Sequence, residues 1–124
     1  MTKEFCTYEQ ALALKELGFD EPCFGRWIEP TELSISAPSD DEYCLQQHEF
    51  SWTALAPLYQ QAFRWFREKH KMNSGIIPHY DYFYFIIKDF SGGKEYYSDD
   101  TIELTYKEAE QACLDKLIEI CKTK

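Results

Sequence analysis

The chain has 124 residues and a mass of 14.7 kDa, the size of one ordinary domain, and we expect residues 1–124 to form a single domain. Hydrophobic residues make up 44% and charged residues 28% of the sequence, which is the composition of a folded protein and excludes a disordered chain. The net charge of −9 argues against direct nucleic-acid binding, because a polyanion would be repelled. No apolar run approaches the roughly 20 residues that a membrane span needs.

The cysteines indicate a reducing compartment. They are Cys6, Cys23, Cys44, Cys113 and Cys121. Their number is odd, none belongs to a C-x-x-C pair, and the opening residues 2–5 do not read as a signal peptide. We therefore expect a cytoplasmic protein without a disulfide framework.

The first predicted element is a helix over residues 8–17. Thr7 and Gln10 have the spacing of a capping box, in which each side chain bonds the backbone N–H of the other residue. Residues 11–17 are good helix formers, and Gly18 supplies the left-handed conformation that ends a helix.

The stretch from residue 19 to residue 50 predicts short elements. Prolines and glycine interrupt it too often for a long helix. We expect short strands near residues 23–28 and 33–36.

A second helix is predicted over residues 57–71. Pro57 suits a first helical position, where its missing N–H costs nothing. Apolar residues then recur at helical spacing: Leu58, Tyr59, Ala62, Phe63, Trp65 and Phe66. The turn-forming residues 73–75 are expected to end the helix.

A β-hairpin is predicted next, between residues 80–90 and 94–104. The first strand is an aromatic and β-branched run in which both alternating faces are apolar. One face holds Tyr82, Tyr84 and Ile86 and the other holds Phe83, Phe85 and Ile87. Residues 91–94, Ser-Gly-Gly-Lys, are a turn signal.

The last predicted element is a helix over residues 106–121. Thr105 and Glu108 form a second capping box, and apolar residues keep the helical period after it. The element order predicts an α+β fold, in which a small antiparallel sheet of about three to four strands, including the hairpin, packs against three helices.

The sequence contains no recognisable phosphate-binding, catalytic or metal-binding motif. The sequence contains neither G-x-x-x-x-G-K-[ST] nor G-x-G-x-x-G. Cys44 and His48 are four residues apart and could be half of a zinc site or a nucleophile–base pair. No convincing second pair of zinc ligands is found, and no local motif supports a nucleophile–base pair. We expect a packed cysteine and a surface histidine there, no catalytic residue, no metal and no cofactor.

Charge is unevenly distributed along the chain. Residues 1–56 carry a net charge of −8, because they hold three basic and eleven acidic groups, whereas residues 57–80 carry +3. Arg64, Arg67 and Lys71 are spaced as a basic stripe on the second helix. The stripe is interpreted as a solvated face that pairs with the acidic half, within the fold or across a homodimer, or else as a patch that binds an anion or a partner.

Five tyrosines cluster in and around the predicted hairpin: Tyr80, Tyr82, Tyr84, Tyr96 and Tyr97. Tyrosine combines an apolar ring with a polar tip and is enriched at protein interfaces. Cross-strand ring pairing that stabilises the sheet is the other interpretation, and both can hold together.

Three blocks of the sequence resemble a known family. They are TYEQALALKELGFDEPCFG from Thr7, APLYQQAFRWFREK from Ala56 and YKEAEQACLDKLIE from Tyr106. In this order they resemble small proteins from phages and prophages of gut anaerobic bacteria. The resemblance implies a mobile-element origin and the cytoplasm of a bacterial host, and it carries over no catalytic residue.

The leading functional hypothesis is a non-enzymatic phage or prophage accessory protein that binds another protein or self-associates. It depends on the aromatic surplus, the split charge and the lack of catalytic motifs. The second hypothesis is an acidic protein that mimics nucleic acid and inhibits a host defence factor, which the charge of −9 motivates. A small enzyme with a Cys/His or carboxylate site is the third.

Overall fold

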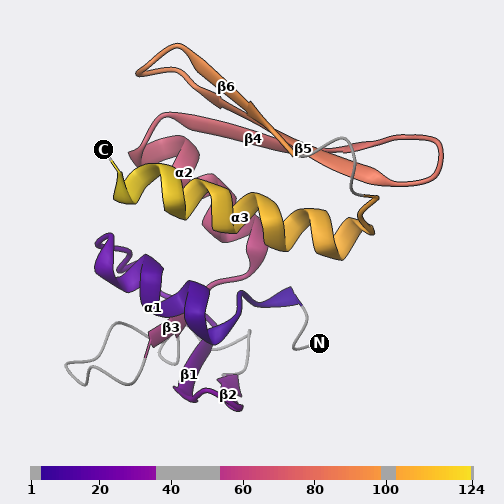
Figure 1. The fold of residues 1–124 in the computed structure, drawn as a ribbon. Helices are drawn as coiled ribbons and strands as arrows, with labels where there is room; N and C mark the ends of the chain where they lie inside the picture. Colours follow the sequence, from indigo (N-terminus) through magenta and orange to yellow (C-terminus); the bar gives the residue numbers. More distant parts are fainter. Residues whose placement is uncertain (1–3, 36–53, 99–102, 124) are drawn as a thin grey trace. The chain divides into compact units, whose positions relative to one another are not determined.

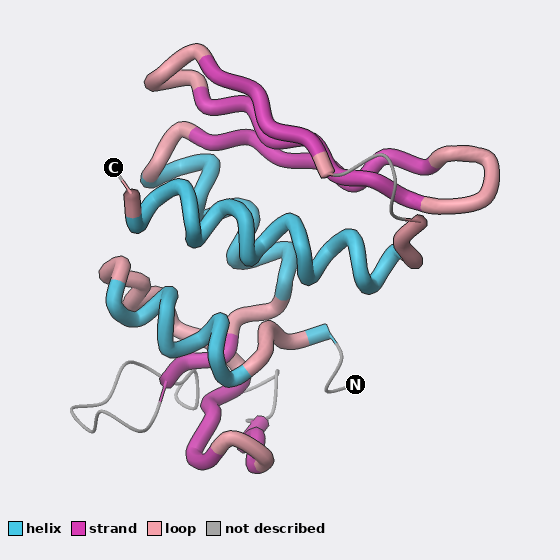
Figure 2. Tube along the Cα trace, in the orientation of Figure 1, coloured by secondary structure: helices cyan, strands magenta, loops and turns pink. Residues whose placement is uncertain are grey.

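The computed structural model describes residues 4–35, 54–98 and 103–123 (Figure 1). In these ranges the chain forms α1 (Tyr8–Glu16), β1 (Gly25–Glu29), β2 (Glu32–Ile35), β3 (Ala54–Ala56), α2 (Tyr59–Lys69), β4 (Met72–Pro78), β5 (Phe83–Asp89), β6 (Lys94–Tyr97) and α3 (Tyr106–Lys122). The predicted α+β class is confirmed. The described strands belong to two antiparallel sheets of three strands each, with the orders β2-β1-β3 and β4-β5-β6 (Figure 2).

The fold divides into two compact units, Met1–Gln61 and Ala62–Lys124. The division lies within α2, after its first three residues. Each unit is described by itself. None of the described helices is long and apolar enough to cross a membrane.

The first unit is built on α1 and the β2-β1-β3 sheet. The predicted capping box of α1 is confirmed: Thr7 Oγ1 accepts from the Gln10 N–H at 3.2 Å, and Gln10 Oε1 accepts from the Thr7 N–H at 3.0 Å. Helix α1 packs against β3 and β1. Gly25 in β1 lies against the Phe5 ring so closely that a Cβ would meet ring carbons at 2.8 and 2.9 Å.

The second unit is built on α3 and the β4-β5-β6 sheet. Strand β5 is central and pairs with β4 over Met72↔Asp89 to Pro78↔Phe83, and with β6 over Asp89↔Lys94 to Ile86↔Tyr97. Helix α3 packs against β5 and β4. Its capping box is also confirmed, since Thr105 and Glu108 exchange the two expected hydrogen bonds.

Strand pleating divides the residues of this sheet between two faces. In β5, Phe85, Ile87 and Asp89 are buried, so the odd-numbered residues face α3. The even-numbered residues 84, 86 and 88 therefore point to the opposite face. Figure 1 shows α3 on one side of the sheet, with no described helix of this unit on the other side.

Strand β4 corrects the predicted end of the second helix. Asn73, Ser74 and Gly75 pair with Lys88, Ile87 and Ile86 of β5 and do not terminate a helix. The turn lies earlier: α2 ends at Lys69, and Lys71 has a φ of 58°. Turn-forming residues tolerate an edge strand because pairing with the apolar β5 outweighs their local preference.

Candidate interaction face

The five tyrosines of the predicted interaction surface lie in three places. Tyr84 and Tyr97 are on the face of the β4-β5-β6 sheet that points away from α3. Tyr96 pairs with Ile87 and so lies on the α3 side. Tyr80 and Tyr82 belong to the turn between β4 and β5. The structure therefore does not bring the five rings into one patch.

The side of the sheet opposite α3 is apolar at its centre. The strand register aligns Ile77 with Tyr84 and Ile86 with Tyr97 across neighbouring strands. The side chains of Ile77, Tyr84 and Ile86 are half-buried, and Tyr97 is 56% exposed. We call this surface the open sheet face, and define it as Ile77, Tyr84, Ile86, Lys88, Glu95 and Tyr97.

The charged groups of the open sheet face balance each other. Lys88 Nζ lies 3.9 Å from Glu95 Oε1, and both side chains are about half exposed. The Tyr97 hydroxyl donates a hydrogen bond to Glu95 Oε2. This hydrogen bond, made to the carboxylate, raises the pKa of Tyr97 above its ordinary value.

The turn between β4 and β5 carries the most exposed aromatic residue of the described chain. The turn is closed by the hydrogen bond from the His79 N–H to the Tyr82 carbonyl, at 2.7 Å. The His79 ring stacks on Tyr82 with centroids 4.5 Å apart, and Tyr80 at the tip is 96% exposed.

Tyr96 is engaged within the second unit. Lys116 Nζ lies over its ring, 5.7 Å from the centroid, and 3.4 Å from Glu119 Oε2. This tyrosine therefore contributes to packing between β6 and α3, which is a different contact from the predicted cross-strand ring pairing.

The predicted basic stripe is divided by the end of α2. Arg64, Arg67 and Lys71 are all exposed, but Lys71 lies beyond the last helical residue and its φ of 58° breaks the helical path. The helical spacing that joined the three residues therefore holds only for Arg64 and Arg67.

The four described cysteines are poorly suited to act as nucleophiles. Cys6, Cys23, Cys113 and Cys121 are buried thiols. Burial, with the nearby Cys23, raises the pKa of Cys6 far above its ordinary value, and burial raises the pKa of Cys113 to about 12. Both are therefore protonated and poor nucleophiles at neutral pH. Cys44 and His48 lie outside the described residues.

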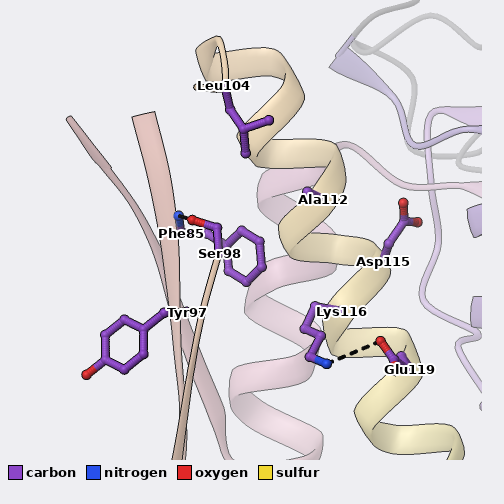
Figure 3. Close-up of a pocket in the computed structure, with 8 residues that line it drawn as sticks. All are labelled: Phe85, Tyr97, Ser98, Leu104, Ala112, Asp115, Lys116 and Glu119. Carbon is purple, nitrogen blue, oxygen red and sulfur yellow. Dashed lines mark hydrogen bonds and ion pairs between the residues drawn. The ribbon is translucent and has the colours of Figure 1, made fainter. Parts of the chain in front are cut away.

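A cavity of about 360 Å³ lies between α3 and the strands β5 and β6 (Figure 3). It is lined by Phe85, Tyr97, Ser98, Leu104, Ala112, Asp115, Lys116 and Glu119. Ser98 Oγ accepts a hydrogen bond from the Phe85 N–H at 3.1 Å, and Lys116 pairs with Glu119. Figure 3 shows the Tyr97 ring on the far side of the strands from α3, which agrees with its place on the open sheet face. Lys116 and Glu119 of this cavity therefore neutralise each other, and Asp115 is its third charged residue.

Metal chemistry has no site among the described residues, since no group of three or more His, Cys, Asp or Glu side chains is placed to hold an ion. The described residues thus offer an interaction face and cavities.

Sequence reasoning found part of the open sheet face and missed the rest. The alternation in residues 82–87 placed Tyr84 and Ile86 on one face, which is confirmed. Ile77 was missed because β4 was not predicted. Lys88 and Glu95 could have been found from the hairpin register, which follows once the turn at residues 90–93 is fixed.

Comparison with known proteins adds no relative. Neither a protein-family model, nor a curated protein, nor a solved structure matches the chain. The resemblance of the three sequence blocks to phage and prophage proteins stays a prediction.

Proposed function

We propose that the chain is a non-enzymatic accessory protein, of the phage or prophage kind that its three sequence blocks resemble, and that it acts by self-association through the open sheet face. The observation that carries the proposal is the face itself. Two isoleucines and two tyrosines lie in register on the side of the sheet that α3 does not cover. Apolar groups gathered in this way on a folded surface are typical of protein–protein contacts.

The charge of the chain favours a second copy as the partner. Each copy carries −9, so two copies repel each other over most of their surfaces. The open sheet face carries one Lys and one Glu and is neutral. A two-fold axis through its centre would bring Lys88 of each copy toward Glu95 of the other, which is the self-complementary arrangement that an isologous dimer requires.

The open sheet face is small for a protein–protein interface. Three strands of at most seven residues make a surface of about 14 by 23 Å. This is less than the roughly 800 Å² per partner that a standard stable interface buries. The expected dimer is therefore weak and transient.

Light scattering coupled to size-exclusion chromatography, over a concentration series up to about 500 µM, tests the proposal. We expect the mass to rise from monomer toward dimer. Association should tighten with added salt, because salt screens the repulsion between two acidic copies while the apolar contact persists.

Two variants locate the contact. Ile86→Lys and Tyr97→Lys place a charge in the centre and on the β6 side of the face, and each should keep the protein monomeric while circular dichroism stays unchanged. Tyr80→Ala is the matched aromatic control, since Tyr80 lies at the turn tip and is 96% exposed. It should dimerise like the wild type. A wild type that is monomeric at every concentration, or lysine variants that dimerise normally, would refute the proposal.

A further inference from the structure

A second cavity of about 360 Å³ lies at the start of α3, apart from the open sheet face. It is lined by Asp81, Tyr82, Phe83, Glu103, Leu104, Thr105 and Tyr106. We call it the Tyr106 cavity. Its residues come from the β4–β5 turn, the first residue of β5, the segment that leads into α3, and the first residue of α3.

The frame of the Tyr106 cavity is held by backbone bonds and a helix cap. The Phe83 N–H donates to the Leu104 carbonyl at 2.9 Å, which fixes the segment before α3 against β5. The capping box of Thr105 and Glu108 fixes where α3 begins. The cavity therefore exists before any ligand arrives, so little ordering opposes binding.

Aromatic rings form part of the lining. Phe83 and Tyr106 meet edge to face, with centroids 5.4 Å apart and an interplanar angle of 89°. The two rings thus form two perpendicular sides of the cavity. Tyr106 is 45% exposed, so its ring is accessible from solvent. The faces of such rings carry a negative potential that attracts cations.

The charged groups of the lining are both acidic. Asp81 and Glu103 are exposed, and no described Lys, Arg or His is part of the lining or forms a salt bridge with either carboxylate. The partial positive charge at the start of α3 is already partly satisfied, because the Thr105 N–H bonds Glu108 Oε1 and the Glu108 N–H bonds Thr105 Oγ1. The two carboxylates give the cavity a negative potential.

The other cavity along α3 supplies an internal precedent. Lys116, which lines that cavity, has its Nζ over the neighbouring Tyr96 ring and beside the Glu119 carboxylate, so a cation is held by one ring and one acid. The lining of the Tyr106 cavity likewise combines aromatic rings with acids, and none of the described residues that form it is a Lys, Arg or His. A cation from outside would complete the same arrangement.

We propose that the Tyr106 cavity binds an organic cation, namely an alkylated ammonium group. Apolar substituents suit the rings and Leu104, and the positive charge suits Asp81 and Glu103. Because an alkylated ammonium is weakly hydrated, it loses less solvation on entering an aromatic site than a bare ammonium does. The cation could be a free quaternary amine or a methylated lysine side chain of a peptide, and these two sources share the chemistry that the cavity recognises.

NMR titration of the ¹⁵N-labelled protein with four probes tests the proposal. The probes are choline, an N-acetyl-trimethyllysine amide, an N-acetyl-lysine amide and 3,3-dimethylbutanol, the neutral isostere of choline. We expect choline and trimethyllysine to shift the amide signals of residues 81–83 and 103–106 with dissociation constants of about 1–10 mM. Tighter binding of trimethyllysine than of choline would assign the site to a peptide, and the reverse order would assign it to a free amine. Binding of the neutral isostere as tightly as choline, or no binding of either cation, would overturn the proposal.

Variants separate the rings from the acids. Asp81→Asn combined with Glu103→Gln keeps the shape and removes both charges, and it should weaken choline binding at least fivefold. Tyr106→Leu should weaken it similarly, whereas Tyr106→Phe, which keeps the ring, should retain it. Tyr80→Ala, outside the lining, should bind like the wild type. Equal affinity in the wild type, the acid variant and Tyr106→Leu would overturn the assignment. All these variants should still self-associate, which distinguishes failure here from failure of the dimer proposal.

Discussion

Tyr59 and Gln10 are joined by a buried hydrogen bond between residues 49 positions apart in the sequence. The Tyr59 hydroxyl, in the first turn of α2, donates to Gln10 Oε1 at 2.9 Å. The same oxygen accepts the Thr7 N–H at 3.0 Å and so completes the capping box of α1. One side-chain oxygen therefore both caps a helix and ties the start of α2 into the first unit.

Removing Gln10 should destabilise the protein more than removing the Tyr59 hydroxyl. Tyr59→Phe deletes one hydrogen bond and leaves the cap, so we expect a loss of about 1 kcal/mol in the free energy of unfolding. Gln10→Leu deletes the acceptor of two bonds and leaves a buried hydroxyl, so we expect a loss of about 2–3 kcal/mol. Urea unfolding followed by tryptophan fluorescence measures both. Glu9→Ala, at an exposed position of α1, is the control, and equal losses in the two variants would contradict the shared role of Gln10.

Gly25→Ala should destabilise the first unit through a steric clash. The new Cβ would lie 2.8 and 2.9 Å from carbons of the buried Phe5 ring and 3.2 Å from the Ala56 carbonyl oxygen. Overpacking of this kind costs about 1–3 kcal/mol. Gly75→Ala is the matched control, because its nearest atoms lie at 3.7 and 4.0 Å, an ordinary contact distance. Thermal unfolding that is affected equally by the two changes would argue against the packing described for Phe5.

Ser98→Ala should weaken the junction of β5 and β6. Ser98 Oγ accepts the Phe85 N–H at 3.1 Å, while the Ser98 N–H donates to the Phe85 carbonyl at 3.1 Å. Alanine keeps the second bond and leaves a buried N–H without its acceptor, which costs about 1–3 kcal/mol. Hydrogen exchange of the Phe85 amide should accelerate accordingly. Ser34→Ala, at an exposed position of β2, should leave that exchange unchanged, and a Phe85 amide equally protected in Ser98→Ala would contradict the contact.

Glu108 should contribute stability that depends on pH. Hydrogen bonds with Thr105 lower the pKa of Glu108 below its ordinary value. The largest cause is the bond with the Thr105 backbone, and the bond with the Thr105 side chain comes next. Its contribution is therefore fully present above the pKa of the unfolded chain, and it is lost as the pH falls through the lower, folded pKa. Glu108→Gln keeps an acceptor oxygen but cannot ionise. The stability difference between wild type and Glu108→Gln should shrink between neutral pH and about pH 3. A difference that is constant over this range would show that the charge has no role in the cap.

Local signals predicted much of the fold. Both capping boxes depend on residues three apart, so Thr7 with Gln10 and Thr105 with Glu108 could be found without knowing the tertiary structure. Strand β5 is equally clear from the sequence, because an aromatic and β-branched run occupies most of it. Strand β4 was not predicted, since Asn73 to Gly75 favour a turn locally and become extended only by pairing with β5.

The candidate sites depend more strongly on tertiary structure. Tyr84 and Ile86 share a face through local alternation, but Ile77 joins them only through the β4–β5 register. The Tyr106 cavity is lined by both Asp81 and Glu103, which are 22 positions apart, and no spacing rule predicts that they share a cavity. The cluster of tyrosines in the sequence predicts an interaction surface. The pleating of β5 and β6 and the turn between β4 and β5 place the rings in three separate positions.

The open sheet face as a two-fold contact is the central claim, and a mixing experiment tests it most directly. Ile86→Lys and Ile86→Glu should each be monomeric by light scattering, because like charges would face each other across the axis. An equimolar mixture of the two should recover a dimer mass, because opposite charges then meet there. The account predicts this recovery in the mixture alone. A mixture that stays monomeric while the wild type dimerises, or single variants that dimerise unmixed, would contradict it.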